Sequence, residues 1–296
     1  MKNTALIVGG GLIGMSFAAR FEAHGWSVRI ADVRPEVGEV VTEKLSSSAE
    51  FFLDYQEAAK GVDFVQEAGP ENLEWKHEVF ARLGEITDDH TILASSSSAI
   101  LPSKIAQDNP AAARIIIGHP FTPPALMPVL EVVPSDKTDP NVVSRAMEVY
   151  RSIGFDPSRL QKEIFGFVGN RIQKVIMWES FYLLQQGVID AENLDRIIRN
   201  SLGLRYAAVG PLEANRLGGG PEGARKIILG IAGGWDKAMP AGVPDMNHPD
   251  EVLDQIDAAY GTDAQSFEMR SKVRDAKLKG ILEVLAKARR DAGENS

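Results

Sequence analysis

The sequence predicts an α/β fold in which a doubly wound, mainly parallel sheet is followed by an all-helical C-terminal domain. Two observations lead to this prediction: short apolar runs alternate with helical stretches in the first half, and helical patterns alone follow after about Gln161. Strands that alternate with helices favour a parallel sheet covered on both faces. We therefore expect two domains, over residues 1–161 and 162–296.

The expected strands are short apolar runs, long enough for a buried strand and too short for a helix. They are Thr4–Gly9, Val28–Asp32, Asp63–Ala68, Thr91–Ser95, Ile115–His119 and Val129–Val133. Helices are expected over Leu12–His24, which Gly25 ends, and over Glu71–Gly84, where apolar residues share a face. Asp139 and Pro140 predict an N-cap and the first position of a helix that reaches about Ile153.

The second domain is expected to consist of helices joined by loops rich in Gly and Pro. The expected helices are Val168–Gln186, Ala191–Leu202, Glu222–Trp235 and a long charged one over about Gln265–Arg290. The loops contain Gly218–Pro221 and Met239–Gly242.

Composition excludes several classes of function. The chain has 32 Lys and Arg against 41 Asp and Glu, a formal charge of −9, and no basic run, so nucleic-acid binding is not expected. The lack of cysteine removes disulfides, thiolate nucleophiles and Cys-ligated zinc, and no His or carboxylate spacing suggests a metal site. With no signal-peptide pattern and no apolar stretch of membrane-spanning length, we expect a cytoplasmic enzyme.

The turn Gly9-Gly10-Gly11-Leu12-Ile13-Gly14 fits G-x-G-x-x-G between a strand and a helix, which is the context of a Rossmann-type dinucleotide site. Gly9 allows the tight turn, Gly11 the approach of the pyrophosphate and Gly14 the packing of helix on strand. Leu12 and Ile13 lie in the first helical turn, whose N–H groups attract phosphate. Asp32 is placed to bind ribose hydroxyls and disfavours a 2′-phosphate, so NAD is expected over NADP, although Arg34 lies close by. A glycine turn without function is the alternative.

His119 and Glu131 are the candidate catalytic pair. His119 closes a strand, and Pro120 keeps it extended. Glu131 lies in an otherwise apolar strand, where a carboxylate needs a partner or a raised pKa. Paired with it, His119 could accept an alcohol proton while Glu131 orients the imidazole. From the spacing alone, a structural histidine and an edge-strand glutamate stay open.

Several ordered motifs together resemble the 3-hydroxyacyl-CoA dehydrogenase superfamily. They are Gly9–Gly14, Ala94–Ser98, Gly118-His119-Pro120-Phe121-Thr122-Pro123-Pro124, Glu131, Gly166–Arg171 and Gly203–Glu213. The resemblance is closer to the short-substrate branch of L-gulonate 3-dehydrogenase (lambda-crystallin) and carnitine dehydrogenase. It implies NAD-dependent oxidation of a secondary alcohol to a 3-oxo acid, a pocket between domains and a homodimer.

The resemblance also implies roles for individual residues. His119 is the base paired with Glu131. Ser98 and Asn170 hold the substrate hydroxyl and the nicotinamide region, while Glu71 and Lys76 occupy positions that touch the cofactor. Each of these four has a structural alternative: a turn former for Ser98, a helix cap for Asn170, a first-turn charge for Glu71 and a solvated helix residue for Lys76.

Two departures from the family pattern argue against an acyl-CoA substrate. Thr122 replaces the usual Asn, and the stretch between Asp32 and Asp63 is short, with no basic cluster for the CoA phosphates. We therefore expect a small, free 3-hydroxy acid similar to L-gulonate. Arg205 is the candidate for binding its carboxylate, because an Arg fork suits bidentate recognition; a helix-end arginine is the alternative.

Three other functions stay open. L-Carnitine would need an aromatic pocket for its quaternary ammonium, for which Trp178, Phe181 and Tyr182 are candidates, although Phe181 and Tyr182 also suit a helical core. A 3-hydroxyacyl-CoA substrate on the same scaffold is the second. A non-catalytic NAD-binding protein of the crystallin type is the third, and the joint presence of His119, Glu131, Ser98 and Asn170 disfavours it.

Overall fold

The computed structural model of the chain describes residues 3–219, 226, 230, 241–243, 245, 250–260 and 264–293. It divides into two compact units, Met1–Arg171 and Ile172–Ser296. The first unit extends beyond the predicted boundary at residue 161 because the following segment packs against the sheet. The Leu160 N–H donates to the Val132 carbonyl, and Phe167 is fully buried in the core of the first unit.

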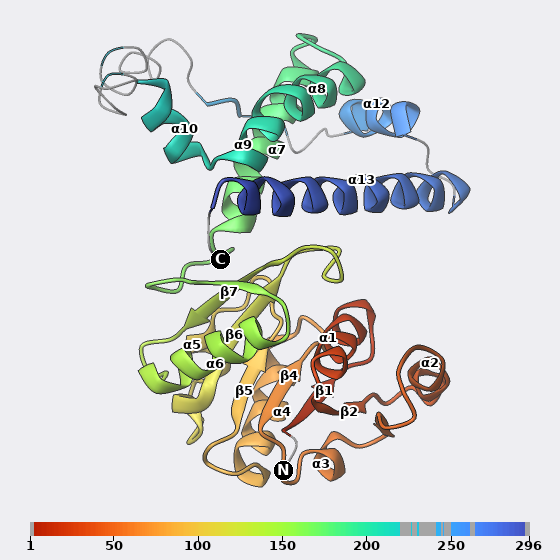
Figure 1. Ribbon diagram of the computed structural model, residues 1–296, viewed down its shortest axis with the longest axis vertical. Helices are drawn as coiled ribbons and strands as arrows, with labels where there is room; N and C mark the ends of the chain where they lie inside the picture. The colour runs from red at the N-terminus through yellow and green to blue at the C-terminus, as the bar shows by residue number, and fades with distance from the viewer. Residues whose placement is uncertain are drawn as a thin grey trace. The chain divides into compact units, whose positions relative to one another are not determined.

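The first unit is built on one sheet with the strand order β3-β2-β1-β4-β5-β6-β7-β8 (Figure 1). Every neighbouring pair is parallel except β6 and β7. The strands are β1 Thr4–Val8, β2 Ser27–Ala31, β3 Glu50–Phe52, β4 Phe64–Glu67, β5 Ile92–Ser95, β6 Ile115–Pro120, β7 Val129–Pro134 and β8 Asp156–Arg159. The predicted doubly wound, mainly parallel sheet is confirmed.

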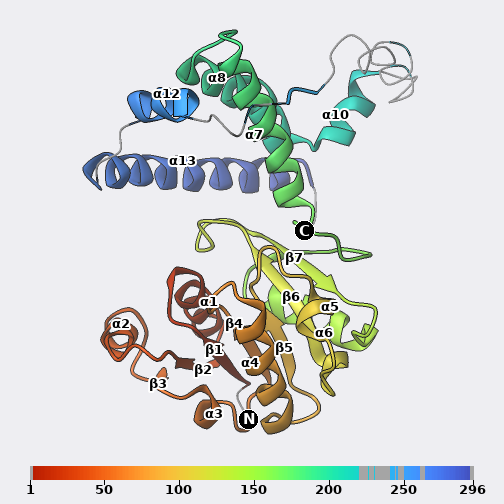
Figure 2. The same cartoon turned by 180° about the vertical axis from the view of Figure 1, so that it is seen from behind.

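Helices cover both faces of this sheet (Figures 1 and 2). Successive residues of β1 point to opposite faces: Ala5 and Ile7 join one buried cluster, and Leu6 and Val8 join the other. The first cluster includes side chains of α1 Leu12–Ala23, α2 Glu36–Lys44 and α6 Pro140–Ser152. The second includes side chains of α3 Tyr55–Ala58, α4 Leu73–Ile86 and α5 Pro102–Ile105, and a 3₁₀ turn spans Ala112–Arg114.

Local sequence signals account for the ends of several helices. The Asp139 carboxylate accepts a hydrogen bond from the Asn141 N–H, with Pro140 in the first turn of α6, as predicted. The side chain of Asn72 caps α4 through the Trp75 N–H, so α4 starts after Glu71 and not at it. Gly25, with φ +87°, follows the end of α1.

Three features of the first unit were not predicted. Strand β8 has no apolar alternation, because only Pro157 of its residues is buried. The β6–β7 pair is antiparallel, since its short connection leaves no room for a crossover helix. The stretch between Asp32 and Asp63 holds α2, β3 and α3, none of which is among the expected elements.

The second unit is helical in its described part. Its elements are α7 Gly169–Gln185, which begins in the first unit, α8 Ala191–Ile198, a π-helical turn Arg199–Gly203, α9 Leu204–Ala208, α10 Pro211–Gly218, α12 Asp250–Tyr260 and α13 Ala264–Asp291. The predicted helix Glu222–Trp235 lies outside the described residues apart from positions 226 and 230. No helix of the described part is long and apolar enough to cross a membrane.

Candidate active site

The glycine turn joins β1 to the N-terminus of α1. Gly9 has φ +105°, and a Cβ there would come within 2.6 Å of the Ala68 carbonyl oxygen. A Cβ on Gly14 would lie 1.8 Å from the Gly9 carbonyl oxygen, so Gly14 allows helix α1 to pack on the turn. A Cβ on Gly11 would meet nothing within 4 Å, because Gly11 lines an open cavity. This turn leaves space in front of the α1 N-terminus, where Leu12 and Ile13 form the first turn.

Asp32 follows β2 and faces this turn. One carboxylate oxygen, Oδ2, accepts a hydrogen bond of 2.8 Å from the Gly10 N–H. Arg34 donates from Nε to Oδ1 at 2.9 Å and from a terminal nitrogen to Oδ2 at 2.8 Å. The bonds from Arg34, joined by that from Gly10, lower the pKa of Asp32 to about 2 against the opposing effect of partial burial. Asp32 is therefore ionised at neutral pH.

A cavity of about 410 Å³ lies beside the turn. Gly9, Gly11 and Asp32 line it together with Arg34, and apolar and aromatic side chains complete the wall: Val8, Leu53, Tyr55, Pro70 and Trp75. Sequence reasoning missed Leu53, Tyr55 and Trp75. Leu53 and Tyr55 follow β3, which was not predicted, and the rule that ligands bind at the carboxyl ends of parallel strands would have singled them out.

His119 and Glu131 lie directly opposite each other on β6 and β7. In an antiparallel pair, opposite residues on one face have their side chains in contact. His119 Nδ1 lies 2.8 Å from Glu131 Oε2, and both side chains are buried, with exposed fractions of 8% and 4%. Phe121 and Phe167 pack against the imidazole. The predicted pair therefore has hydrogen-bonding geometry, and Nδ1 is the nitrogen it engages.

Glu131 also connects β7 to the start of α7. Its other oxygen, Oε1, accepts hydrogen bonds from the Val168 N–H at 2.9 Å and the Gly169 N–H at 3.0 Å. Burial alone would raise the pKa of this carboxyl, but the bonds from His119, Gly169 and Val168 outweigh it and lower the pKa. An ionised Glu131 thus bonds His119 Nδ1 through one oxygen and the start of α7 through the other, which fixes the orientation of the imidazole.

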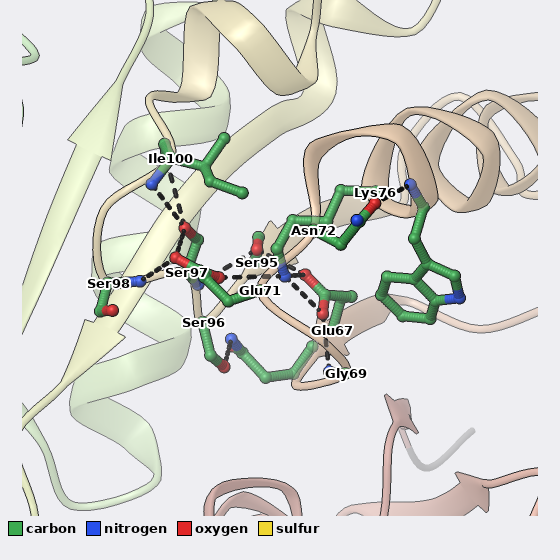
Figure 3. A network of polar contacts seen from close by, with 12 residues as sticks. Glu67, Gly69, Glu71, Asn72, Lys76, Ser95, Ser96, Ser97, Ser98 and Ile100 are labelled. Carbon is green, nitrogen blue, oxygen red and sulfur yellow. Dashed lines mark hydrogen bonds and ion pairs between the residues drawn. The ribbon is translucent and has the colours of Figure 1, made fainter.

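The turn that follows β5 brings Ser98, Asn170 and Glu71 together. Asn170 Nδ2 donates to the Ser98 carbonyl at 2.9 Å, and the Ser98 side chain is exposed. Glu71 Oε1 accepts hydrogen bonds from Ser97 Oγ at 2.6 Å and from the Ser98 and Ala99 N–H groups at 3.1 Å each (Figure 3). Although burial opposes it, these bonds and the charge of Lys76 lower the pKa of Glu71. Glu71 thus holds the shape of this turn.

Lys76 occupies a different environment from the solvated or cofactor-facing positions expected of it. Its side chain is 1% exposed, and Nζ lies 2.8 and 2.7 Å from the two oxygens of Glu67, which is fully buried (Figure 3). Glu67 also accepts from Ser95 Oγ at 2.5 Å and the Gly69 N–H at 2.7 Å. Lys76 Nζ lies 3.6 Å from Glu71 Oε2, so in this structure it acts inside a buried network that joins β4, β5 and α4.

Comparison with family models places this architecture. Residues 39–164 match the model described as 3-hydroxyacyl-CoA dehydrogenase, NAD binding domain, and residues 166–256 match that of the C-terminal domain. The L-carnitine dehydrogenase of Mesorhizobium japonicum is 33% identical over an alignment that covers 98% of this chain and 85% of the relative. The chain belongs to the 3-hydroxyacyl-CoA dehydrogenase family.

Two further comparisons agree with membership of the 3-hydroxyacyl-CoA dehydrogenase family. The lambda-crystallin homolog of Bos taurus is 38% identical over 71% of this chain and 73% of its own length. A solved structure of 5-formyl-3-hydroxy-2-methylpyridine 4-carboxylic acid 5-dehydrogenase, described as an NAD⁺ dependent dismutase, has a TM-score of 0.82 at 25% identity. The match covers 97% of this chain and 99% of that one.

As a member of this family, the chain is an NAD-dependent dehydrogenase that acts on CH–OH groups. Its residues fit the cofactor: the open space at Gly11 and the α1 N-terminus suit a pyrophosphate, and the ionised Asp32 suits ribose hydroxyls. Among the described residues, no group of three or more His, Cys, Asp or Glu side chains is placed to hold a metal ion.

Two residues singled out by the family resemblance are not members of the networks described above. Arg205 is exposed on α9, in the second unit, and its role in binding a substrate carboxylate stays a prediction. Thr122 is exposed in the connection between β6 and β7, close in sequence to His119.

Glu67 was missed by the sequence analysis, although a carboxylate in the buried strand β4 is the same signal that singled out Glu131.

Proposed function

We propose that this dehydrogenase oxidises the secondary alcohol of a small, free 3-hydroxy acid, similar to L-gulonate, to the 3-oxo acid, with His119 as general base. The observation that carries this proposal is the buried hydrogen bond of 2.8 Å between His119 Nδ1 and Glu131 Oε2. Because Nδ1 is engaged, Nε2 is the nitrogen left to accept the alcohol proton. The carboxylate of Glu131 then stabilises the imidazolium that forms.

The remaining groups position the reactants. When bound, NAD supplies the redox step by accepting a hydride from the alcohol carbon. Asn170 Nδ2 is occupied by the Ser98 carbonyl, which supports a joint role in which the Ser98 hydroxyl and the Asn170 amide oxygen hold the substrate hydroxyl. Ser98 is well suited to this task because Glu71 binds its N–H and that of the next residue, so the turn is preorganised.

A free acid is favoured over a CoA ester by the charge of the segment between β2 and β4. Residues 33–62 contain six carboxylates and only three cations, Arg34, Lys44 and Lys60. One of these, Arg34, is bound to Asp32, and Lys44 ends α2. This segment therefore offers no cationic cluster for the phosphates of CoA, whose binding needs charge-assisted hydrogen bonds.

L-Carnitine is the second candidate substrate, and one observation on α7 supports it. The Lys174 ammonium lies over the Trp178 ring at 4.8 Å from the ring centroid, so this ring accepts a cation on its face. The other two aromatic residues are less available, because Phe181 packs against the small core of the helical unit and the Tyr182 ring lies against Gly242. The L-carnitine dehydrogenase named above is similar over 98% of this chain.

Initial rates of NADH formation with L-gulonate, L-carnitine, 3-hydroxybutyrate and 3-hydroxybutyryl-CoA test the substrate proposal, with NADP⁺ in parallel. Preference for L-gulonate or 3-hydroxybutyrate with NAD⁺ is the expected result. A higher kcat/KM for 3-hydroxybutyryl-CoA would overturn the argument from segment charge, and a preference for L-carnitine would select the second candidate. NADH binding without turnover of any substrate would instead favour a non-catalytic protein of the crystallin type.

The role of His119 needs a separate variant. His119→Gln is expected to lose most of kcat, by about 10²- to 10⁴-fold, while NADH binding is retained. His90→Gln is the matched control, because His90 is exposed. In the described part of the chain, its imidazole forms an ion pair only with Asp63. Equal kcat values for His119→Gln and the control would contradict the assignment of His119 as the base.

We also propose that the second unit forms a homodimer. Its described core holds only Leu184, Ala191 and Val252 as buried members, whereas α7 exposes several large apolar side chains. Their exposed fractions are 59% for Ile172, 62% for Val175, 49% for Ile176 and 40% for Met177. Such a face needs an apolar partner, and a second copy is the one the family resemblance implies. Sedimentation velocity at micromolar concentration checks this, and a monomer would refute it.

A further inference from the structure

Ser96 is a polar residue at the carboxyl end of β5 that no functional assignment above uses. Its backbone N–H donates to the Glu67 carbonyl at 2.7 Å, which fixes its position beside β4. Its side chain is partly exposed, unlike the buried Ser95 and Ser97 on either side. Figure 3 shows that the Ser96 side chain points away from the Glu71 carboxylate that binds the following residues.

A chain of hydrogen bonds connects Ser96 to the core. The hydroxyl of Tyr150, on α6, donates to Gln66 Oε1 at 2.8 Å, and Gln66 Nε2 donates to Ser96 Oγ at 2.8 Å. Tyr150 and Gln66 are fully buried. Burial raises the pKa of Tyr150 well above its usual range, so its hydroxyl carries a proton at every physiological pH.

The protonated Tyr150 determines the direction of this chain. If the Gln66 amide were turned over, its nitrogen would donate to Tyr150, and the buried Tyr150 proton would lack an acceptor among the described residues. An unsatisfied buried donor costs free energy, so the amide oxygen must face Tyr150 and the amide nitrogen must face Ser96. Ser96 Oγ is thereby an acceptor toward the core, and its own proton stays available for another acceptor.

We infer that Ser96 donates this proton to the nicotinamide riboside half of bound NAD. In parallel sheets of this kind, ligands bind outside the carboxyl ends of the strands. Asp32 and the glycine turn, at the ends of β2 and β1, suit the adenosine ribose and the pyrophosphate. Strand β5 lies three strand spacings from β2 in the order β2-β1-β4-β5, about 14 Å away. Ser96 therefore faces the part of the cofactor beyond the pyrophosphate, whose hydroxyl and amide oxygens accept hydrogen bonds.

Tyr150 acts through this chain as a positioning residue, because it contacts Gln66 and not the cofactor. A Cβ on Gly118 would lie only 1.9 Å from the Tyr150 hydroxyl oxygen. The glycine before His119 is therefore required for Tyr150 to pack in this position. The inference depends on NAD binding, and it is independent of the proposed substrate and of His119 as the base.

Affinities of the full-length chain for NADH and for ADP, which lacks the nicotinamide riboside half, test the inference by titration calorimetry. Ser96→Ala is expected to weaken NADH binding about threefold to tenfold and to leave ADP binding unchanged. Ser96→Thr, which keeps the hydroxyl, is expected to bind NADH more tightly than Ser96→Ala. Ser144→Ala is the control, since Ser144 is an exposed serine on α6 whose hydroxyl donates to the Pro140 carbonyl of its own helix.

Unchanged NADH affinity in Ser96→Ala would overturn the inference, as would an equal loss for ADP. Tyr150→Phe tests the directional step, because the Gln66 amide can then turn over and accept the Ser96 proton. It is expected to weaken NADH binding and not ADP binding, and ADP affinity reports that the site is still folded. Full NADH affinity in Tyr150→Phe would refute the claim that Tyr150 sets the direction.

Discussion

Glu131→Gln replaces one oxygen of a buried carboxylate by an amide NH₂ group. It should nevertheless move the imidazole proton of His119 from Nδ1 to Nε2. In the native site, Oε1 accepts from the Val168 and Gly169 N–H groups, and Oε2 bonds His119 Nδ1 at 2.8 Å. A Gln side chain has one acceptor end and one donor end. Whichever end faces the two backbone N–H groups, the other must face His119.

The two backbone donors decide the orientation of this amide. With its oxygen toward Val168 and Gly169, both N–H groups keep their acceptor; the reverse leaves both unpaired, at about 1–3 kcal/mol each. The amide nitrogen therefore faces His119, and Nδ1 becomes an acceptor. The imidazole proton then resides on Nε2, the atom required as the base. A comparable carboxylate-to-amide change in a serine protease triad lowers kcat by about 10⁴-fold, and we expect a loss of about 10³- to 10⁴-fold here.

Steady-state oxidation of the preferred substrate measures this effect, with kcat and KM determined separately. We expect kcat to fall while the NADH affinity and the thermal unfolding midpoint stay close to wild type, because all three hydrogen bonds retain a partner. Glu148→Gln, at an exposed position on α6, is the control for the substitution itself. A kcat within about tenfold of wild type would refute the assignment of Nε2 as the proton acceptor.

Three further predictions concern stability, substrate binding and pH. Lys76→Met leaves Glu67 buried without its cation and should lower the free energy of unfolding in urea by about 3–5 kcal/mol. The loss should be smaller in a Glu67→Gln background. Lys272→Met, which breaks an exposed ion pair, is the control and should change this free energy little. Arg205→Ala should raise KM for acidic substrates strongly with no change in unfolding midpoint, and an unchanged KM would exclude Arg205 from carboxylate binding. Because the pKa of Asp32 is lowered from 3.8 to about 2, its ionised form stabilises the fold above pH 4, and this contribution is lost as the pH falls toward 2. In acid unfolding titrations, Asp32→Asn should therefore lose less stability than the wild type between about pH 4 and pH 2. An equal loss in both proteins would contradict the lowered pKa.

Local signals were sufficient for six of the eight strands, the glycine turn and helices α1, α4, α6, α7, α8 and α13, because periodicity and capping are encoded within a few residues. The His119–Glu131 pair was predictable only as one candidate, since a carboxylate in an apolar strand requires a partner but a structural histidine and an edge-strand glutamate fit the same spacing. The antiparallel register that sets these residues opposite each other was not, because it depends on the turn between β6 and β7.

Lys76 shows where sequence reasoning fails. On a helix with an apolar face, a lysine is expected to be exposed to solvent. The family resemblance instead implies that Lys76 touches the cofactor. Its burial follows from the approach of α4 to β4, which brings it to Glu67, nine positions earlier in the chain. The network from Tyr150 to Ser96 is still less visible, since Tyr150 and Gln66 are 84 positions apart and meet only through the packing of α6 on the sheet. Partner choice over such separations is a property of the tertiary fold.

The pair of Asp32 and Arg34 leads to a last prediction, on cofactor preference. Arg34 is bound to both oxygens of Asp32, and its own side chain is 54% exposed. The carboxylate therefore has two effects against a 2′-phosphate: it repels the phosphate, and it occupies the cation that would bind it. Asp32→Asn should remove both effects, because an amide can still accept from the Gly10 N–H but no longer binds the guanidinium by charge.

We expect Asp32→Asn to weaken NAD binding about tenfold or more, since bonds between ribose hydroxyls and a charged group are lost, and to strengthen NADP binding. The gain for NADP should disappear in Asp32→Asn/Arg34→Ala, whereas the loss for NAD should remain, and Glu36→Gln serves as a nearby exposed control. Kd values from titration of each variant with NADH and NADPH separate the two effects. A gain for NADPH that persists without Arg34 would show that removal of the carboxylate charge is sufficient, and that the guanidinium is only a counterion to Asp32.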